Sequence, residues 1–64
     1  MMNKVKVKKE EIIGHDIYGL VMEVSFILES LSGYEIASNY NRRVLNAKNN
    51  IERLKIISSY IEIM

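Results

Sequence analysis

Two long segments of the chain carry apolar residues at alternating intervals of three and four. The first comprises Ile13, Ile17, Leu20, Val24, Ile27 and Leu31, and it is widened by Val21 and Leu28. The second, after one initial four-residue step, comprises Ile36, Tyr40, Val44, Ala47, Ile51, Leu54, Ser58 and Ile61. This spacing is typical of helices that bury one face, and the chain has no proline. The sequence therefore predicts an all-α fold, with helices over about 11–31 and 36–63.

The connection between these segments, LSGYE, is short. Gly33 is suited to ending the first helix, and Ser32 with Glu35, or Ser38, is suited to capping the second. A short connection makes two helices antiparallel. One hairpin does not cover its own apolar stripe, and a chain of 64 residues buries only about 60% of its unfolded surface when it folds alone. We therefore expect an antiparallel helical hairpin that forms a homodimeric four-helix bundle.

Composition excludes several classes of site. The chain has no cysteine and one histidine, so neither a disulfide nor a zinc site is expected. Neither a metal nor a cofactor is predicted. No apolar run has the length of a membrane span, and a cytoplasmic location is expected.

Charge is unevenly distributed along the chain. Residues 1–9 carry four lysines, whereas residues 10–64 carry five basic and eight acidic side chains. The basic stretch is interpreted as an N-terminal tail or linker, or alternatively as an arm for nucleic acid or an anionic surface. Because the remaining chain is net negative and would repel phosphates, nucleic-acid binding is not expected.

The only histidine lies in the stretch GHDIYGL. His15 is two residues from both Ile13 and Ile17, so on a helix it would point away from the core. A neutral imidazole is a nucleophile, and Asp16 beside it is able to orient one ring nitrogen or accept its proton. The alternative is an ordinary surface histidine near the start of a helix.

A second apolar row follows the histidine. Tyr18, Met22 and Phe26 are spaced i, i+4, i+8, off the main stripe. Gly19 within the predicted helix costs about 1 kcal/mol relative to alanine. A glycine there would let the backbone of a partner approach the helix closely. We interpret Tyr18, Gly19, Met22 and Phe26 as partner-binding residues. Alternatively, the three large side chains pack against the second helix of the partner hairpin.

One stretch resembles the phosphoacceptor box of sensor histidine kinases: HDIYGLVMEVSFILESL. The matching positions are His15, Asp16, Ile17, Val21, Val24, Leu28, Glu29 and Leu31. The later stretch NAKNNIERLKIISSYIE is similar to that family's second dimerisation helix, through Glu52, Arg53 and Leu54. The resemblance spans residues 12–63, and it departs from the family pattern at Leu20, where a proline is usual.

The resemblance implies a dimerisation and histidine-phosphotransfer domain of two-component signalling. His15 would accept a phosphoryl group from ATP held by a separate kinase domain, or from a phosphorylated receiver. Asp16 would act as general base. Tyr18, Gly19 and Met22 would contact the response regulator receiver domain, whose aspartate then receives the phosphate. The chain would be either a phosphorelay shuttle or decoy, or a piece of a longer kinase.

The alternative is a small non-catalytic dimeric helical adaptor or regulator that binds a protein or RNA partner. The basic residues of the second predicted helix are Arg42, Arg43, Lys48, Arg53 and Lys55. These side chains would be able to contact successive phosphates of an RNA backbone. Alternatively, they form the ordinary charged outer surface of a bundle helix. A pure dimerisation module would share the same predicted fold.

Overall fold

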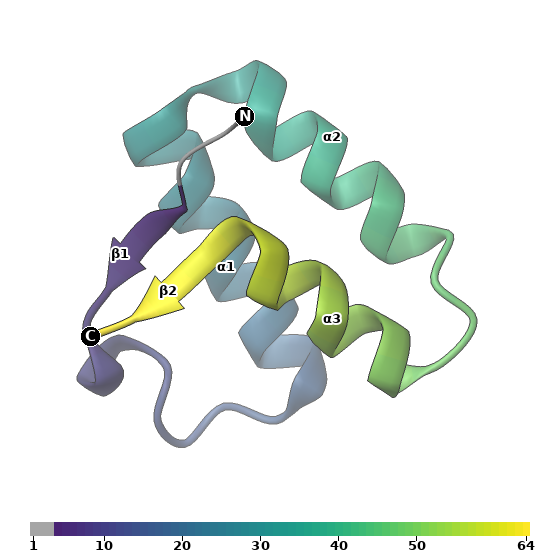
Figure 1. Cartoon of the computed structure of the whole chain (residues 1–64), viewed down its shortest axis with the longest axis horizontal. Helices are drawn as coiled ribbons and strands as arrows, with labels where there is room; N and C mark the ends of the chain where they lie inside the picture. The colour runs from purple at the N-terminus through teal and green to yellow at the C-terminus, as the bar shows by residue number, and fades with distance from the viewer. Residues whose placement is uncertain (1–3) are drawn as a thin grey trace.

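The computed structural model describes residues 4–64, which form helices and a small parallel sheet (Figure 1). In chain order the elements are β1 (Val5–Val7), the 3-10 turn η1 (Lys9–Glu11), α1 (Ile17–Ser32), α2 (Tyr34–Leu45), α3 (Asn50–Tyr60) and β2 (Ile61–Ile63). The prediction of a mostly helical chain is confirmed. The sheet was not predicted.

Helix α1 begins later than its apolar spacing predicts. Gly14 has a φ of +91°, a conformation that favours glycine, and it separates η1 from the helix. Asp16 then serves as the N-cap, because its Oδ1 accepts a hydrogen bond of 2.7 Å from the backbone N–H of Gly19. The expected helix over about 11–31 is therefore corrected to a single turn, a loop and a helix from Ile17.

The expected second helix over about 36–63 is also wrong, since the chain turns between α2 and α3. The side chain of Asn49 caps α3 by accepting a hydrogen bond of 2.9 Å from the N–H of Glu52. The Glu52 carboxylate in turn accepts a bond of 2.8 Å from the N–H of Lys48. These local bonds satisfy backbone donors that would otherwise be unpaired at the helix start, so they favour a new helix over a continuous one.

The two ends of the described chain meet in a parallel sheet (Figure 1). Val5 pairs with Ile61, Lys6 with Glu62, and Val7 with Ile63. The valines and isoleucines occupy one face of this ladder, and Lys6 lies opposite Glu62 on the other. Residues 4–9 are therefore not the tail or linker that the sequence predicts, and residues 1–3 lie outside the described residues.

Every helix and both strands contribute to one core. Its buried members are Val7, Val24, Leu28, Ala37, Tyr40, Val44, Ile57, Tyr60 and Ile61. Tyr40 is fully buried, its hydroxyl donates a 3.0 Å hydrogen bond to the Val21 carbonyl, and its ring meets that of Tyr60 edge to face, with centroids 5.3 Å apart. Burial raises the pKa of the Tyr40 hydroxyl above its ordinary value.

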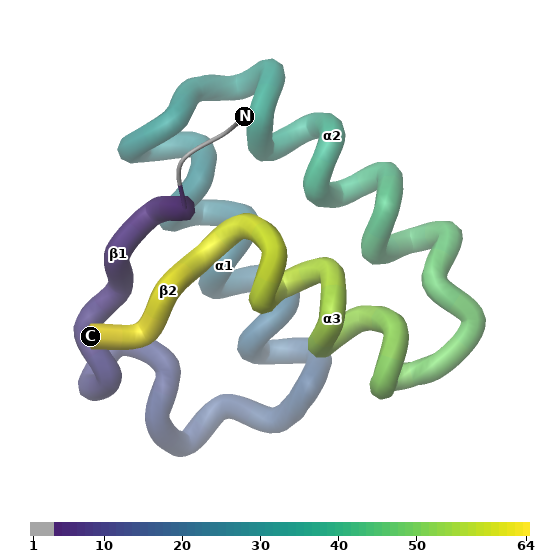
Figure 2. Tube along the Cα trace, in the orientation of Figure 1, coloured from purple at the N-terminus to yellow at the C-terminus, as the bar shows by residue number. Residues whose placement is uncertain are grey.

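The turn after α2 explains why the predicted hairpin bundle differs from the structure. It brings α3 against both α1 and α2 (Figure 2). The central part of the apolar stripe, with Val24, Leu28 and Tyr40, is thus buried within a single chain, whereas Ile13, Leu31 and Ile51 are exposed. The buried part does not require the second hairpin that we expected. The homodimer stays a prediction.

Candidate functional site

His15 lies in the loop between η1 and α1, one residue before the N-cap of the helix. Its side chain is exposed, as is that of Asp16. The histidine is therefore next to a helix start and not on a helix face. The prediction from Ile13 and Ile17 placed His15 on the outer face of a helix, and the structure corrects this position to a loop.

Asp16 has a structural role that the sequence interpretation missed. Its Oδ1 is engaged by the N–H of Gly19, so the carboxylate stabilises the first turn of α1. The signal was present, because an aspartate directly before an apolar periodic segment is typical of an N-cap. This bond engages one of the two carboxylate oxygens.

Gly19 lies directly beneath the histidine. A Cβ at this position would be 3.1 Å from Nδ1 of His15 and 3.2 Å from Oδ1 of Asp16. Both distances are shorter than ordinary van der Waals contacts, so the absence of a side chain lets the imidazole and carboxylate fold over the first turn. The structure thus brings His15, Asp16 and Gly19 together, and it gives the glycine a steric reason that we did not predict.

The row formed by Tyr18, Met22 and Phe26, called the α1 ridge below, is exposed along its whole length. The exposed fractions of these side chains are 67%, 60% and 59%. They lie on the side of α1 away from Val24 and Leu28, which are buried. The ridge therefore makes no contribution to the core of the single chain.

A hollow of about 300 Å³ lies beside the end of the ridge. Its lining consists of Glu11, Glu23, Phe26, Ile27, Ser30 and Leu31. The aromatic and aliphatic groups supply apolar surface, and the two glutamates place negative charge at the same hollow. Such a combination suits a partner with an apolar anchor and a cationic neighbour.

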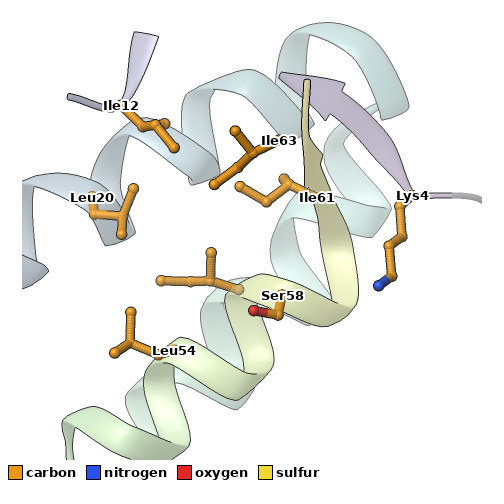
Figure 3. A pocket seen from close by; sticks show the side chains of 8 residues that line it. Lys4, Ile12, Leu20, Leu54, Ser58, Ile61 and Ile63 are labelled. Atoms are coloured by element: carbon orange, nitrogen blue, oxygen red, sulfur yellow. The ribbon is translucent and has the colours of Figure 1, made fainter. Parts of the chain in front are cut away.

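A second hollow of about 310 Å³ lies between β2, α3, α1 and the loop before α1 (Figure 3). It is lined by Ile12, Leu20, Leu54, Ile57, Ile61 and Ile63, together with Lys4 and Ser58. In Figure 3 Lys4 stands beside β2, apart from the isoleucines and leucines. The sequence interpretation missed this hollow because its walls come from segments that are far apart in the chain.

The basic residues interpreted as a possible RNA surface have different environments. The Arg43 guanidinium donates a 3.3 Å hydrogen bond to the Tyr60 hydroxyl and lies 5.3 Å from the centre of that ring. Arg53 donates a 2.8 Å bond to the Asn50 side chain. Arg43 therefore links α2 to α3, whereas the bond between Arg53 and Asn50 lies within α3. Lys48 and Lys55 are exposed.

Within residues 4–64, no group of three or more His, Cys, Asp or Glu side chains is arranged to hold a metal ion. None of the helices in that range has the length and apolar character needed to cross a bilayer. Comparison with protein-family models, curated proteins and solved structures gave no match. The resemblance to sensor histidine kinases and the cytoplasmic location therefore stay predictions.

Proposed function

We propose that this chain is a protein-binding adaptor whose working surface is the α1 ridge. One observation carries the proposal: a continuous apolar row is exposed on the outer side of a helix whose inner side is already buried. Isolated exposed apolar residues are ordinary. A contiguous row of tyrosine, methionine and phenylalanine is different, because these residue types are enriched at protein interfaces.

The charges near the ridge support a protein partner over a phosphate backbone. Glu23 lines the hollow beside Phe26 together with Glu11, and Glu29 is exposed on the same helix. Acidic side chains disfavour close approach of RNA phosphates. The adaptor therefore binds protein in this proposal.

The experiment introduces a photo-crosslinking residue at Met22 and, as a matched control, at Asn41, which is exposed on α2. We expect one adduct specific to position 22 in cells that express the full chain. The captured protein is then purified, and its affinity is measured by calorimetry for the wild type and for Phe26→Ser. A loss of at least about tenfold is expected for an aromatic interface anchor.

Two results would contradict the adaptor proposal. One is equal crosslinking from positions 22 and 41, which would show that the ridge is not preferred. The other is an unchanged affinity for Phe26→Ser, which would place the binding surface elsewhere.

The second candidate is a phosphoacceptor that works through His15, and the arrangement of His15 over Gly19 favours it. The imidazole is exposed beside a carboxylate, and the nearby ridge would dock the receiver domain. An imidazole nitrogen would attack the phosphorus of an aspartyl phosphate, so that an N–P bond forms, the O–P bond breaks and the aspartate leaves as a carboxylate. The imidazole proton would pass to Asp16 or to water.

This candidate is tested by intact mass at neutral to alkaline pH. The chain is mixed with phosphorylated receiver domains and, separately, with an ATP-binding kinase domain and ATP. The expected result is one added phosphoryl group that is labile in acid and missing from His15→Gln. An adduct that persists in His15→Gln would assign the phosphate to another residue.

A further inference from the structure

The charges of this chain are separated along its sequence. Residues 10–41 hold six acidic side chains and no lysine or arginine: Glu10, Glu11, Asp16, Glu23, Glu29 and Glu35. Residues 42–64 hold five basic side chains and two acidic ones. The acidic segment contains α1 with its exposed ridge, whereas the basic segment contains the end of α2 and all of α3. One molecule thus presents an acidic part and a basic part.

The basic part has apolar groups of its own. Leu45 and Ile51 lie on either side of the turn between α2 and α3, with exposed fractions of 82% and 67%. Exposed basic residues accompany them: Lys48 in the turn and Lys55 one helical turn beyond Ile51. We call Leu45, Lys48, Ile51 and Lys55 the α2–α3 corner.

The corner and the α1 ridge have complementary chemistry. The ridge ends at a hollow whose lining includes Phe26, Glu11 and Glu23. A leucine or isoleucine anchor flanked by lysines suits this hollow, because the apolar group leaves water while opposite charges face one another.

We infer that a second copy of the chain is a partner of the α1 ridge, and that it docks head to tail through its α2–α3 corner. This inference rests on the proposed function, in which the ridge is a docking surface. A symmetric contact of ridge on ridge is disfavoured, because it would bring Glu23 and Glu29 of one copy toward the same acids of the other.

Head-to-tail docking has a geometric consequence. The corner lies at the edge of the molecule farthest from the sheet, and α1 crosses behind the other elements (Figure 2). Two surfaces on different parts of one chain make a heterologous contact. Each added copy then presents one open ridge and one open corner, so the assembly grows until it closes into a ring or continues as a filament.

The test uses two variants of the full chain, each blocked on one surface. Glu23→Lys/Glu29→Lys reverses the charge near the ridge and keeps the corner, while Lys48→Glu/Lys55→Glu reverses the corner and keeps the ridge. All four positions lie at the surface of the helices or the turn, and circular dichroism checks the fold of each variant. Mass is measured by sedimentation over a range of protein concentrations.

We expect the wild type to gain mass with concentration and to lose it in high salt, where exposed charges are screened. Each variant alone should associate at least about tenfold more weakly, because like charges then face one another across the contact. An equimolar mixture of the two should recover association, because opposite charges meet at both contacts: the unchanged corner of one variant faces the unchanged ridge of the other, and the reversed ridge faces the reversed corner.

Three results would overturn the inference. They are a wild type that stays monomeric at every concentration, variants that still dimerise alone, and a mixture that forms no dimer. A monomeric wild type whose ridge still binds another protein, with loss in Phe26→Ser, would reject this inference and leave the adaptor function in place. Dimerisation of the variants alone would instead indicate a symmetric interface.

Discussion

The two sides of α1 carry similar residues and have opposite environments. On the inner side Val24 and Leu28 are buried against the rest of the chain, whereas on the outer side Met22 and Phe26 are exposed. Hydrophobicity alone does not separate these sides. The difference comes from the tertiary structure. The turn after α2 places α3 against the inner side of α1, and the outer side is left uncovered. The inner side stabilises the fold, and we propose that the outer side binds a partner.

The largest expected effect comes from creating a cavity on the inner side. Leu28→Ala should lower the free energy of unfolding by about 3 kcal/mol, because it removes buried methyl groups from a packed core. The matched change on the outer side, Met22→Ala, should alter it by no more than about 0.5 kcal/mol. Urea unfolding monitored by circular dichroism measures both. Equal losses would show that the ridge is buried in solution.

The hydrogen bond between Tyr40 and the Val21 carbonyl gives a smaller effect on the same inner side. Tyr40→Phe should lower the free energy of unfolding by about 1 kcal/mol at neutral pH. Burial raises the pKa of Tyr40 in the folded state above its value in the unfolded chain. The fold therefore favours the neutral hydroxyl over the ionised one. That stability is present below about pH 10, the ordinary pKa of tyrosine, and is lost as the pH rises toward the higher folded pKa.

The wild type should therefore lose stability above about pH 10 more steeply than Tyr40→Phe. Urea unfolding at a series of alkaline pH values gives both curves. Parallel curves would indicate that the Tyr40 hydroxyl titrates in the fold as it does in the unfolded chain.

The N-cap of α1 stabilises the start of the helix that carries both sides. Asp16→Ala should lower the free energy of unfolding by about 1 kcal/mol, since the Gly19 N–H loses its partner. Asp16→Asn retains a capping oxygen and should lose much less. The asparagine variant also separates capping from chemistry: a stable Asp16→Asn protein that no longer accepts phosphate would assign the carboxylate a role in the transfer.

The smallest effect on stability is expected on the outer side itself. Phe26→Ser should change the free energy of unfolding by no more than about 0.5 kcal/mol and should still weaken partner binding. A large loss of stability would contradict the division of α1 into a folding side and a binding side. Thermal unfolding beside the calorimetric affinity gives the comparison on one sample.

The helices were predictable from the sequence because their signals are local. The apolar spacing located most of α1 and α2, and it set Tyr18, Met22 and Phe26 apart from the main stripe. The same spacing concealed the break after Leu45, since it continues through Ala47 and Ile51 without interruption. The capping pair Asn49 and Glu52 is the local signal for a new helix, and the uninterrupted apolar spacing masks it.

The sheet was harder to predict because its two strands give weak signals on their own. Val5-Lys6-Val7 and Ile61-Glu62-Ile63 both alternate apolar and charged residues, which is typical of half-buried strands. Each is only three residues long, and nothing in either strand specifies a partner at the other end of the chain. The apolar hollow beside β2 depends on this pairing, so it was missed as well.

The parallel register of β1 and β2 also determines how the fold would resist force. If residues 4 and 64 are pulled apart, tension enters β1 at its first residue and leaves β2 at its last, so the strands slide along one another. All hydrogen bonds of the ladder are then loaded together, whereas an antiparallel hairpin pulled from its open end would release them one at a time. A sheet of three residue pairs would thereby act as a mechanical clamp, because it resists shear before the helices separate.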